Sequence, residues 1–190
     1  MKINPIKLIG NWDEGWAFDK HIISSTFIGT DIYGHDIYDT TRSELGELLY
    51  YFKYRGKYEN LDKIIEAIKP FLDEWCIINT IDIVLPVPPT KVRNYQPATE
   101  IAYAIAENYK LYFSDDVLEK VSDVESKNMD RNNKELDGTI IVKKKASRKH
   151  NILLVDDLYS TGSTLNECIN ALRKDPLLNK IYVLTITKTR

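Results

Sequence analysis

The residues with the clearest chemical potential lie in one short segment that ends at Thr164. Two adjacent carboxylates, Asp156 and Asp157, follow an apolar run over 152–155. After them come small hydroxyl-bearing residues and a glycine: Ser160, Thr161, Gly162, Ser163 and Thr164. Free amides at the start of a helix favour an anion, and glycine allows the backbone to approach it closely. The segment therefore predicts a binding site for a phosphate monoester.

The two carboxylates need a different partner, because they would repel a phosphate that touched them. Neutral hydroxyls, such as the 2′- and 3′-hydroxyls of a ribose, fit them, and so does a divalent cation. A ligand with a phosphate at one end and a diol at the other is a ribose 5-phosphate. A capped helix would also begin with Ser or Thr, but the paired acids favour the binding site. The sequence contains neither GxxxxGK[ST] nor GxGxxG, which excludes a P-loop and a dinucleotide fingerprint.

The elements around this segment predict a βαβ unit. Residues 152–155 form a continuous apolar run, which is typical of a strand buried on both faces of a parallel sheet. Apolar residues at helical spacing follow over 165–172, and 181–186 predicts the next strand. The crossover should be right-handed.

Further elements upstream extend the same pattern. Apolar residues repeat at helical spacing over 45–52 and again over 61–68, where Pro70 is expected to end or kink the helix. Residues 81–85 predict a strand, and a helix should begin near Pro97.

We therefore expect an α/β fold, with an open, mostly parallel sheet and helices on both faces, over residues 41–190 of a single domain. Residues 1–40 are rich in turns and aromatic side chains and are expected to form a small, irregular N-terminal hood. Two strands over 21–28 and 36–40 are candidates within it. A capping box that starts at Thr41 should begin the first helix.

The composition limits the classes of protein to which this chain can belong. The 190 residues are 43% apolar and 28% charged, as in an ordinary globular protein. A net charge of −2 gives no field that draws nucleic acid or membrane, and no apolar run approaches the ~20 residues of a membrane span. Cys76 and Cys168 lie far apart, which excludes a self-contained four-cysteine zinc site. We expect a cytoplasmic protein with neither nucleic acid nor membrane as its partner.

The segment 153–165 resembles the phosphoribosyl pyrophosphate loop of type I phosphoribosyltransferases, in which a hydrophobic run and two acids precede Thr-Gly-Gly/Ser-Thr. The chain is further similar to the ComF-like branch of that superfamily over about residues 45–190. Lys53-Tyr54-Arg55-Gly56 and Pro86-Val87-Pro88 carry this likeness, and residues 93–98 echo it more loosely. The N-terminal four-cysteine zinc ribbon common in that branch is missing, since residues 1–40 contain no cysteine.

The resemblance implies a protein that binds phosphoribosyl pyrophosphate with Mg²⁺ and transfers the phosphoribosyl group to a nitrogenous base or related acceptor. It implies that Asp156 and Asp157 hold the ribose hydroxyls and are the candidate ligands of Mg²⁺, directly or through water, and that residues 160–164 hold the 5-phosphate. The turn after Pro88 would meet the pyrophosphate through Pro89, Thr90 and Lys91.

A long polar stretch over 122–138 is expected to be a loop that closes over this site. Closure would bring Lys127 or Arg131 to the pyrophosphate. Lys53 and Arg55 either reach a phosphate or complement the dipole at a helix end.

Other functions stay open at the level of sequence. A non-catalytic regulator could bind the same ligand, or a nucleotide, as a signal. A competence-like partner in DNA uptake would need a basic face. An enzyme should have an acceptor pocket beneath the N-terminal hood, and a homodimer is among the partners considered.

Overall fold

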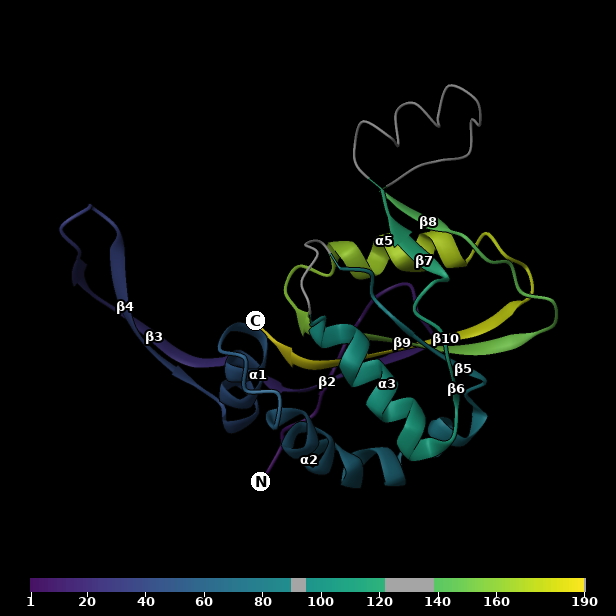
Figure 1. Ribbon diagram of the computed structural model, residues 1–190, viewed down its shortest axis with the longest axis horizontal. Coiled ribbons are helices and arrows are strands. Elements are labelled where there is room, and N and C mark those ends of the chain that lie inside the picture. The colour runs from purple at the N-terminus through teal and green to yellow at the C-terminus, as the bar shows by residue number, and fades with distance from the viewer. Residues whose placement is uncertain (90–94, 122–138, 190) are drawn as a thin grey trace.

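The computed structural model describes residues 1–89, 95–121 and 139–189 (Figure 1). At its centre lies a six-stranded sheet with the strand order β1-β2-β10-β9-β5-β6. The strands are β1 (Ile6–Lys7), β2 (Glu14–Lys20), β5 (Ile83–Pro86), β6 (Tyr112–Phe113), β9 (His150–Tyr159) and β10 (Leu178–Lys188). β1 pairs with β2 in antiparallel fashion, and the other four pairings in this sheet are parallel. The expected α/β class with a mostly parallel sheet is confirmed.

Helices cover both faces of the sheet, as expected (Figure 1). Leu153 and Val155 of β9 pack against helices on one face, whereas Ile152 and Leu154 pack against a helix on the other. Successive strand residues point to opposite faces, so this continuous apolar run serves both layers. The first layer contains α1 (Glu44–Tyr54), α2 (Asn60–Glu74) and α3 (Pro97–Tyr109), and the second contains α5 (Ser163–Leu172). A short 3₁₀ helix, η1 (Cys76–Thr80), leads from α2 towards β5.

The N-terminal region differs from the expectation. Residues 1–40 are not irregular, because β1 and β2 belong to the main sheet and β2 lies between β1 and β10. Ala17 and Phe18 are both fully buried, one in each of the two core clusters. A strand buried on both faces lacks the alternation of apolar and polar residues that reveals a half-exposed strand, which explains the error.

A hairpin follows β2 and projects from the body of the molecule (Figure 1). Its strands, β3 (Ile22–Thr30) and β4 (Asp36–Arg42), form a separate two-stranded antiparallel sheet. The two strands predicted in this region are thus confirmed, and both are longer than expected. A third sheet pairs β7 (Leu118–Lys120) with β8 (Ile140–Val142), which the sequence did not suggest.

Helix boundaries show two further differences. α1 is capped by Ser43, whose hydroxyl accepts a hydrogen bond from the Gly46 amide at 2.9 Å, so the predicted cap at Thr41 is wrong by two residues. α2 continues through Pro70 to Glu74. Pro70 is exposed, so water can satisfy the carbonyl that loses its helical hydrogen bond. Among the described residues, no helix is both long and apolar enough to cross a membrane.

Candidate active site

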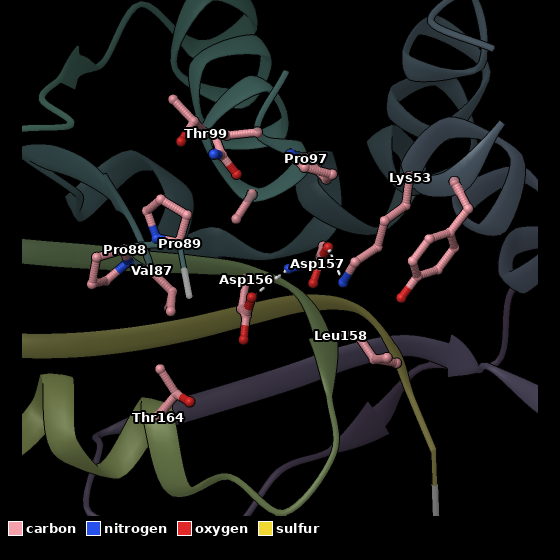
Figure 2. Close-up of a pocket in the computed structure, with 13 residues that line it drawn as sticks. Lys53, Val87, Pro88, Pro89, Pro97, Thr99, Asp156, Asp157, Leu158 and Thr164 are labelled. Atoms are coloured by element: carbon pink, nitrogen blue, oxygen red, sulfur yellow. Dashed lines mark hydrogen bonds and ion pairs between the residues drawn. The ribbon is translucent and has the colours of Figure 1, made fainter. Parts of the chain in front are cut away.

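A cavity of about 440 Å³ lies at the carboxyl-terminal end of the central strands (Figure 2). Open parallel sheets bind ligands at this edge. The lining comes from α1, the segment directly after β5, the start of α3, the end of β9 and the first turn of α5. It consists of Lys53, Tyr54, Val87, Pro88, Pro89, Gln96, Pro97, Ala98, Thr99, Asp156, Asp157, Leu158 and Thr164. Four of the predicted site residues, Pro89, Asp156, Asp157 and Thr164, thus surround one cavity.

The strand that carries the two acids is longer than expected. β9 does not end at Val155 but continues through both aspartates to Tyr159, in parallel register with β10. Because strand residues alternate, Asp157 points to the face covered by α1, α2 and α3, and Asp156 points towards α5. Extension of β9 therefore separates the two carboxylates onto different faces of the sheet.

Asp157 is buried and forms an ion pair with α1. The Lys53 Nζ lies 2.6 Å from the Asp157 Oδ2, and both side chains are largely shielded from water (Figure 2). A buried pair of this kind is balanced only while both partners are present. The ammonium group of Lys53 therefore compensates the Asp157 charge in the absence of a ligand.

Asp156 is half-buried and forms no ion pair with the described residues that line the cavity, because Lys53 contacts Asp157 and acts on Asp156 only as a more distant charge. Its Oδ1 accepts a hydrogen bond from the Asp157 amide at 2.8 Å. Burial, and after it the negative charge of Asp157, raises the pKa of Asp156 to about 7. A ligand that supplies hydroxyl donors or positive charge would favour the ionised form of this group.

The loop between β9 and α5 requires glycine at one position. Gly162 has a φ of +80° and is the N-cap of α5. A Cβ atom there would also lie 2.7 Å from the Tyr159 hydroxyl. The Thr161 and Ser163 hydroxyls lie 2.8 Å apart, and the Ser163 amide donates to the Thr161 Oγ1 at 3.3 Å. The loop is thus organised by its own hydrogen bonds.

Of the predicted loop residues, only Thr164 lines the cavity. Ser160, Thr161 and Ser163 are exposed beside it, and Gly162 is buried. The remaining predicted contacts, Thr90, Lys91, Lys127 and Arg131, lie outside the described residues.

Three features of the site were not predicted as such. Lys53 was expected at a phosphate or a helix dipole, whereas it pairs with Asp157. The first turn of α3, from Pro97 to Thr99, also faces the cavity, and only the likeness over residues 93–98 hinted at it. His21 is buried, and its Nδ1 lies 3.0 Å from the Thr187 Oγ1 of β10.

The His21 imidazole favours its neutral form. Burial, followed by the positive charges of Arg42 and Lys53, lowers the pKa of His21. The sequence alone offered no sign of this, because its three histidines have no spacing that predicts a metal site or a catalytic triad.

Comparisons with known proteins return solved structures only. No protein-family model matches the sequence, and no curated protein matches it. The chain is similar to an adenine phosphoribosyltransferase from Saccharomyces cerevisiae, with 14% identity over 83% of this chain and 82% of that one and a TM-score of 0.46. It is also similar to a purine phosphoribosyltransferase from Pyrococcus horikoshii Ot3, with 12% identity over 70% and 85% of the two chains and a TM-score of 0.44.

A third similar structure is the UMP synthase of Leishmania donovani, with 18% identity and a TM-score of 0.42. That match covers 86% of this chain but only 28% of the synthase. Because all of these identities and TM-scores are low, the function of this chain has to be inferred from its own residues.

Proposed function

We propose that this protein binds phosphoribosyl pyrophosphate together with Mg²⁺ and transfers the phosphoribosyl group to a nitrogenous base or related acceptor, releasing pyrophosphate. One observation carries the proposal. Asp156 and Asp157 lie at the edge of a cavity that also includes Thr164, in the first turn of the helix that follows them. Carboxylates and a helix start beside one cavity suit a ligand that has a diol at one end and a phosphate at the other.

In this proposal the carboxylates accept hydrogen bonds from the ribose hydroxyls. Residues 160–164 hold the 5-phosphate through hydroxyls and the free amides of α5. The cavity volume of about 440 Å³ lies within the usual range of about 300–1,000 Å³ for small-molecule sites. The first turn of α3, together with Pro89, faces the pyrophosphate end, where Thr90, Lys91, Lys127 and Arg131 stay predicted contacts.

The residues of the site can hold Mg²⁺ only if the bound ligand supplies some of the coordinating oxygens. The described residues contain no group of three or more His, Cys, Asp or Glu side chains that could hold a metal ion. Mg²⁺ prefers one or two carboxylates completed by water and phosphate oxygens, and among the described residues of the cavity Asp156 is the carboxylate that forms no ion pair. Asp156 would therefore hold the ion, directly or through water. When bound, Mg²⁺ neutralises charge on the departing pyrophosphate.

The proposed reaction is displacement at C1 of the ribose. The acceptor nitrogen forms a bond to C1 as the bond to the pyrophosphate oxygen breaks, through an oxocarbenium-like state. The residues of this chain contribute mainly by holding the sugar in position and by stabilising the charge of the leaving group.

Calorimetric titration of phosphoribosyl pyrophosphate in the presence of Mg²⁺ tests the proposal. The double variant Asp156→Asn/Asp157→Asn should lose binding by at least about 100-fold, because two charged hydrogen-bond acceptors are removed. A matched control is Asp115→Asn/Asp116→Asn, an exposed pair of adjacent aspartates outside the cavity lining, which should bind as the wild type does. Unaltered binding by the first variant would overturn the assigned roles.

A second candidate function is a non-catalytic sensor of the same ligand. Among the described residues, none of the first forty lines the cavity, so the hood expected over an acceptor does not contribute to the site within one chain. A panel of bases assayed for pyrophosphate release separates the two functions. Release with any base supports the transferase, whereas tight binding without release supports the sensor.

A further inference from the structure

The projecting hairpin of β3 and β4, residues 22–42, has the properties of an unpaired arm (Figure 1). Within the described part of the chain, its strands pair only with each other. Of the thirteen large hydrophobic side chains that are exposed among the described residues, seven lie in this arm. A two-stranded hairpin alone is marginally stable in water, and clustered exposed apolar groups mark an interaction site. The arm is therefore suited to a partner.

The two edges of the arm differ in how they are protected. β4 contains Asp36, Asp39 and Arg42, and charges of this kind prevent an edge strand from pairing further. β3 contains neither a charged residue nor a proline. Two bulges in β3, at Ile23 and Ile28, interrupt its pairing with β4 towards the two ends and leave Ser24–Phe27 in regular pairing. The free edge of β3 between these bulges is thus the one that can accept another strand.

We propose that β3 pairs with β3 of a second copy of this chain, which forms a four-stranded antiparallel sheet and a two-fold symmetric dimer. Hydrogen-bonded and non-hydrogen-bonded pairs alternate along an antiparallel ladder. A two-fold axis through such a ladder must therefore place one residue opposite its own copy. Thr26, the middle residue of the nine in β3, takes that position.

The sequence of β3 is complementary to itself in this register. Within the regular segment Ser24–Phe27, Phe27 lies opposite Ser25 of the second copy, so that a large ring meets a small side chain on each side of the axis. Two threonines meet at the axis itself, a favourable cross-strand pair. Ile23 and Ile28, the extra residues at the two register shifts, flank this segment. This match about a central residue favours a second copy over an unrelated partner.

The charges of the arm fit the same arrangement. Residues 22–42 contain three aspartates and a single basic residue of the lysine or arginine type, Arg42, at the last position of the arm. In the four-stranded sheet the two β4 strands form the outer edges, so Asp36 and Asp39 of the two copies lie far apart. The turn after Thr30 continues towards the start of β3 in the second copy. A cavity of about 540 Å³ lies there, bordered by Ile6, Lys20 and Ile23, and it offers a place for an exposed apolar residue of the turn.

Sedimentation equilibrium of the full chain tests the dimer. The molecular mass measured for the wild type should be twice its chain mass of 22.0 kDa. Thr26→Lys puts two like charges at the axis and should raise the dimer dissociation constant at least about tenfold. Within its own arm the new side chain faces Asp39, so the hairpin is retained. The matched control, Thr41→Lys on the exposed outer strand, should leave the dissociation constant unchanged.

An engineered disulfide between the two copies tests the register of the β3–β3 pairing directly. Directly opposite residues have Cα atoms about 4.5–5.5 Å apart, within the range that a disulfide spans. Thr26→Cys in a Cys76→Ser background, where only the buried Cys168 remains, should give a covalent dimer on mild oxidation, whereas Thr41→Cys should not. A monomeric wild type overturns the proposal, and so does a dimer that tolerates Thr26→Lys without forming the Thr26→Cys cross-link.

Discussion

β9 places one aspartate on each face of the central sheet, one towards α1 and the other towards α5. The two carboxylates have different surroundings. On the α1 face, Asp157 has Lys53 at 2.6 Å. On the α5 face, Asp156 is half-buried beside Thr185 of β10, whose buried hydroxyl has no hydrogen-bond partner among the described residues. Adjacent residues of the same type thus differ in charge compensation.

This difference indicates at which of the two carboxylates a ligand would stabilise the site. The Lys53–Asp157 pair is complete without a ligand, and its first effect is on the stability of the fold. Asp156 raises the free energy of the empty site, because burial opposes its charge. Unfavourable groups of this kind are retained where function requires them. The α5 face is therefore the one on which we expect binding to change the energetics most.

The largest expected effect comes from breaking the compensated pair. Lys53→Met leaves Asp157 buried without its cation, and we expect the free energy of unfolding to fall by about 3 kcal/mol at neutral pH. Urea denaturation measures it. The double variant Lys53→Met/Asp157→Asn should recover part of the loss, because no uncompensated charge remains. A loss below about 1 kcal/mol in the single variant would show that the pair is no stronger than a surface ion pair.

A smaller effect of opposite sign is expected on the other face. Asp156→Asn should stabilise the ligand-free protein at neutral pH by about 2 kcal/mol, since it removes a charge that burial opposes. The same substitution should weaken ligand binding. Thermal unfolding without ligand and titration with ligand measure the two effects on one variant, and a destabilised variant would contradict the difference between the faces.

The pH dependence of this difference has a defined sign. The pKa of Asp156 is higher in the folded chain than its ordinary value of 3.8, so the folded state binds this proton more tightly than the unfolded state does. Its contribution to stability is present at pH values below 3.8 and is lost as the pH rises towards 7. The stability of the wild type relative to Asp156→Asn should therefore fall over that interval. A constant difference would show that Asp156 is not desolvated.

The smallest expected effect concerns the loop on the α5 face. Gly162→Ala combines a positive φ with a Cβ contact to Tyr159, and we expect a loss of about 1–2 kcal/mol. Gly34→Ala is the matched control, because Gly34 has a φ of +85° but nothing within 4 Å of an added Cβ. The excess loss at Gly162 measures the contact alone. Equal losses of stability in the two variants would show that the loop adjusts to an added Cβ without cost and is not organised before a ligand binds.

Much of the fold follows from local patterns. The apolar spacing over 45–52, 61–68 and 165–172 predicts helices that the structure contains, and the run 152–155 predicts the doubly buried strand. These predictions succeed because helical and strand periodicity are properties of neighbouring residues. The segment from Asp156 to Thr164 also predicts a phosphate-binding site from its own residue types, and that prediction is the one addressed by the titration of phosphoribosyl pyrophosphate.

Other features depend on contacts between distant parts of the chain. Three such contacts each join residues more than a hundred positions apart. β2 lies beside β10, Lys53 pairs with Asp157, and His21 is buried against Thr187. No local pattern encodes such contacts, because burial and pairing are decided by where the strands and helices pack.

The sequence by itself determined that two adjacent aspartates precede a glycine-containing helix start in an α/β protein. Only the tertiary structure decided that these aspartates lie on opposite faces of the sheet, and that Asp157, not Asp156, forms the ion pair with Lys53. The physical reason is that residue type sets which charges exist, whereas the packing of helices against each face sets how far each charge is removed from water and what compensates it.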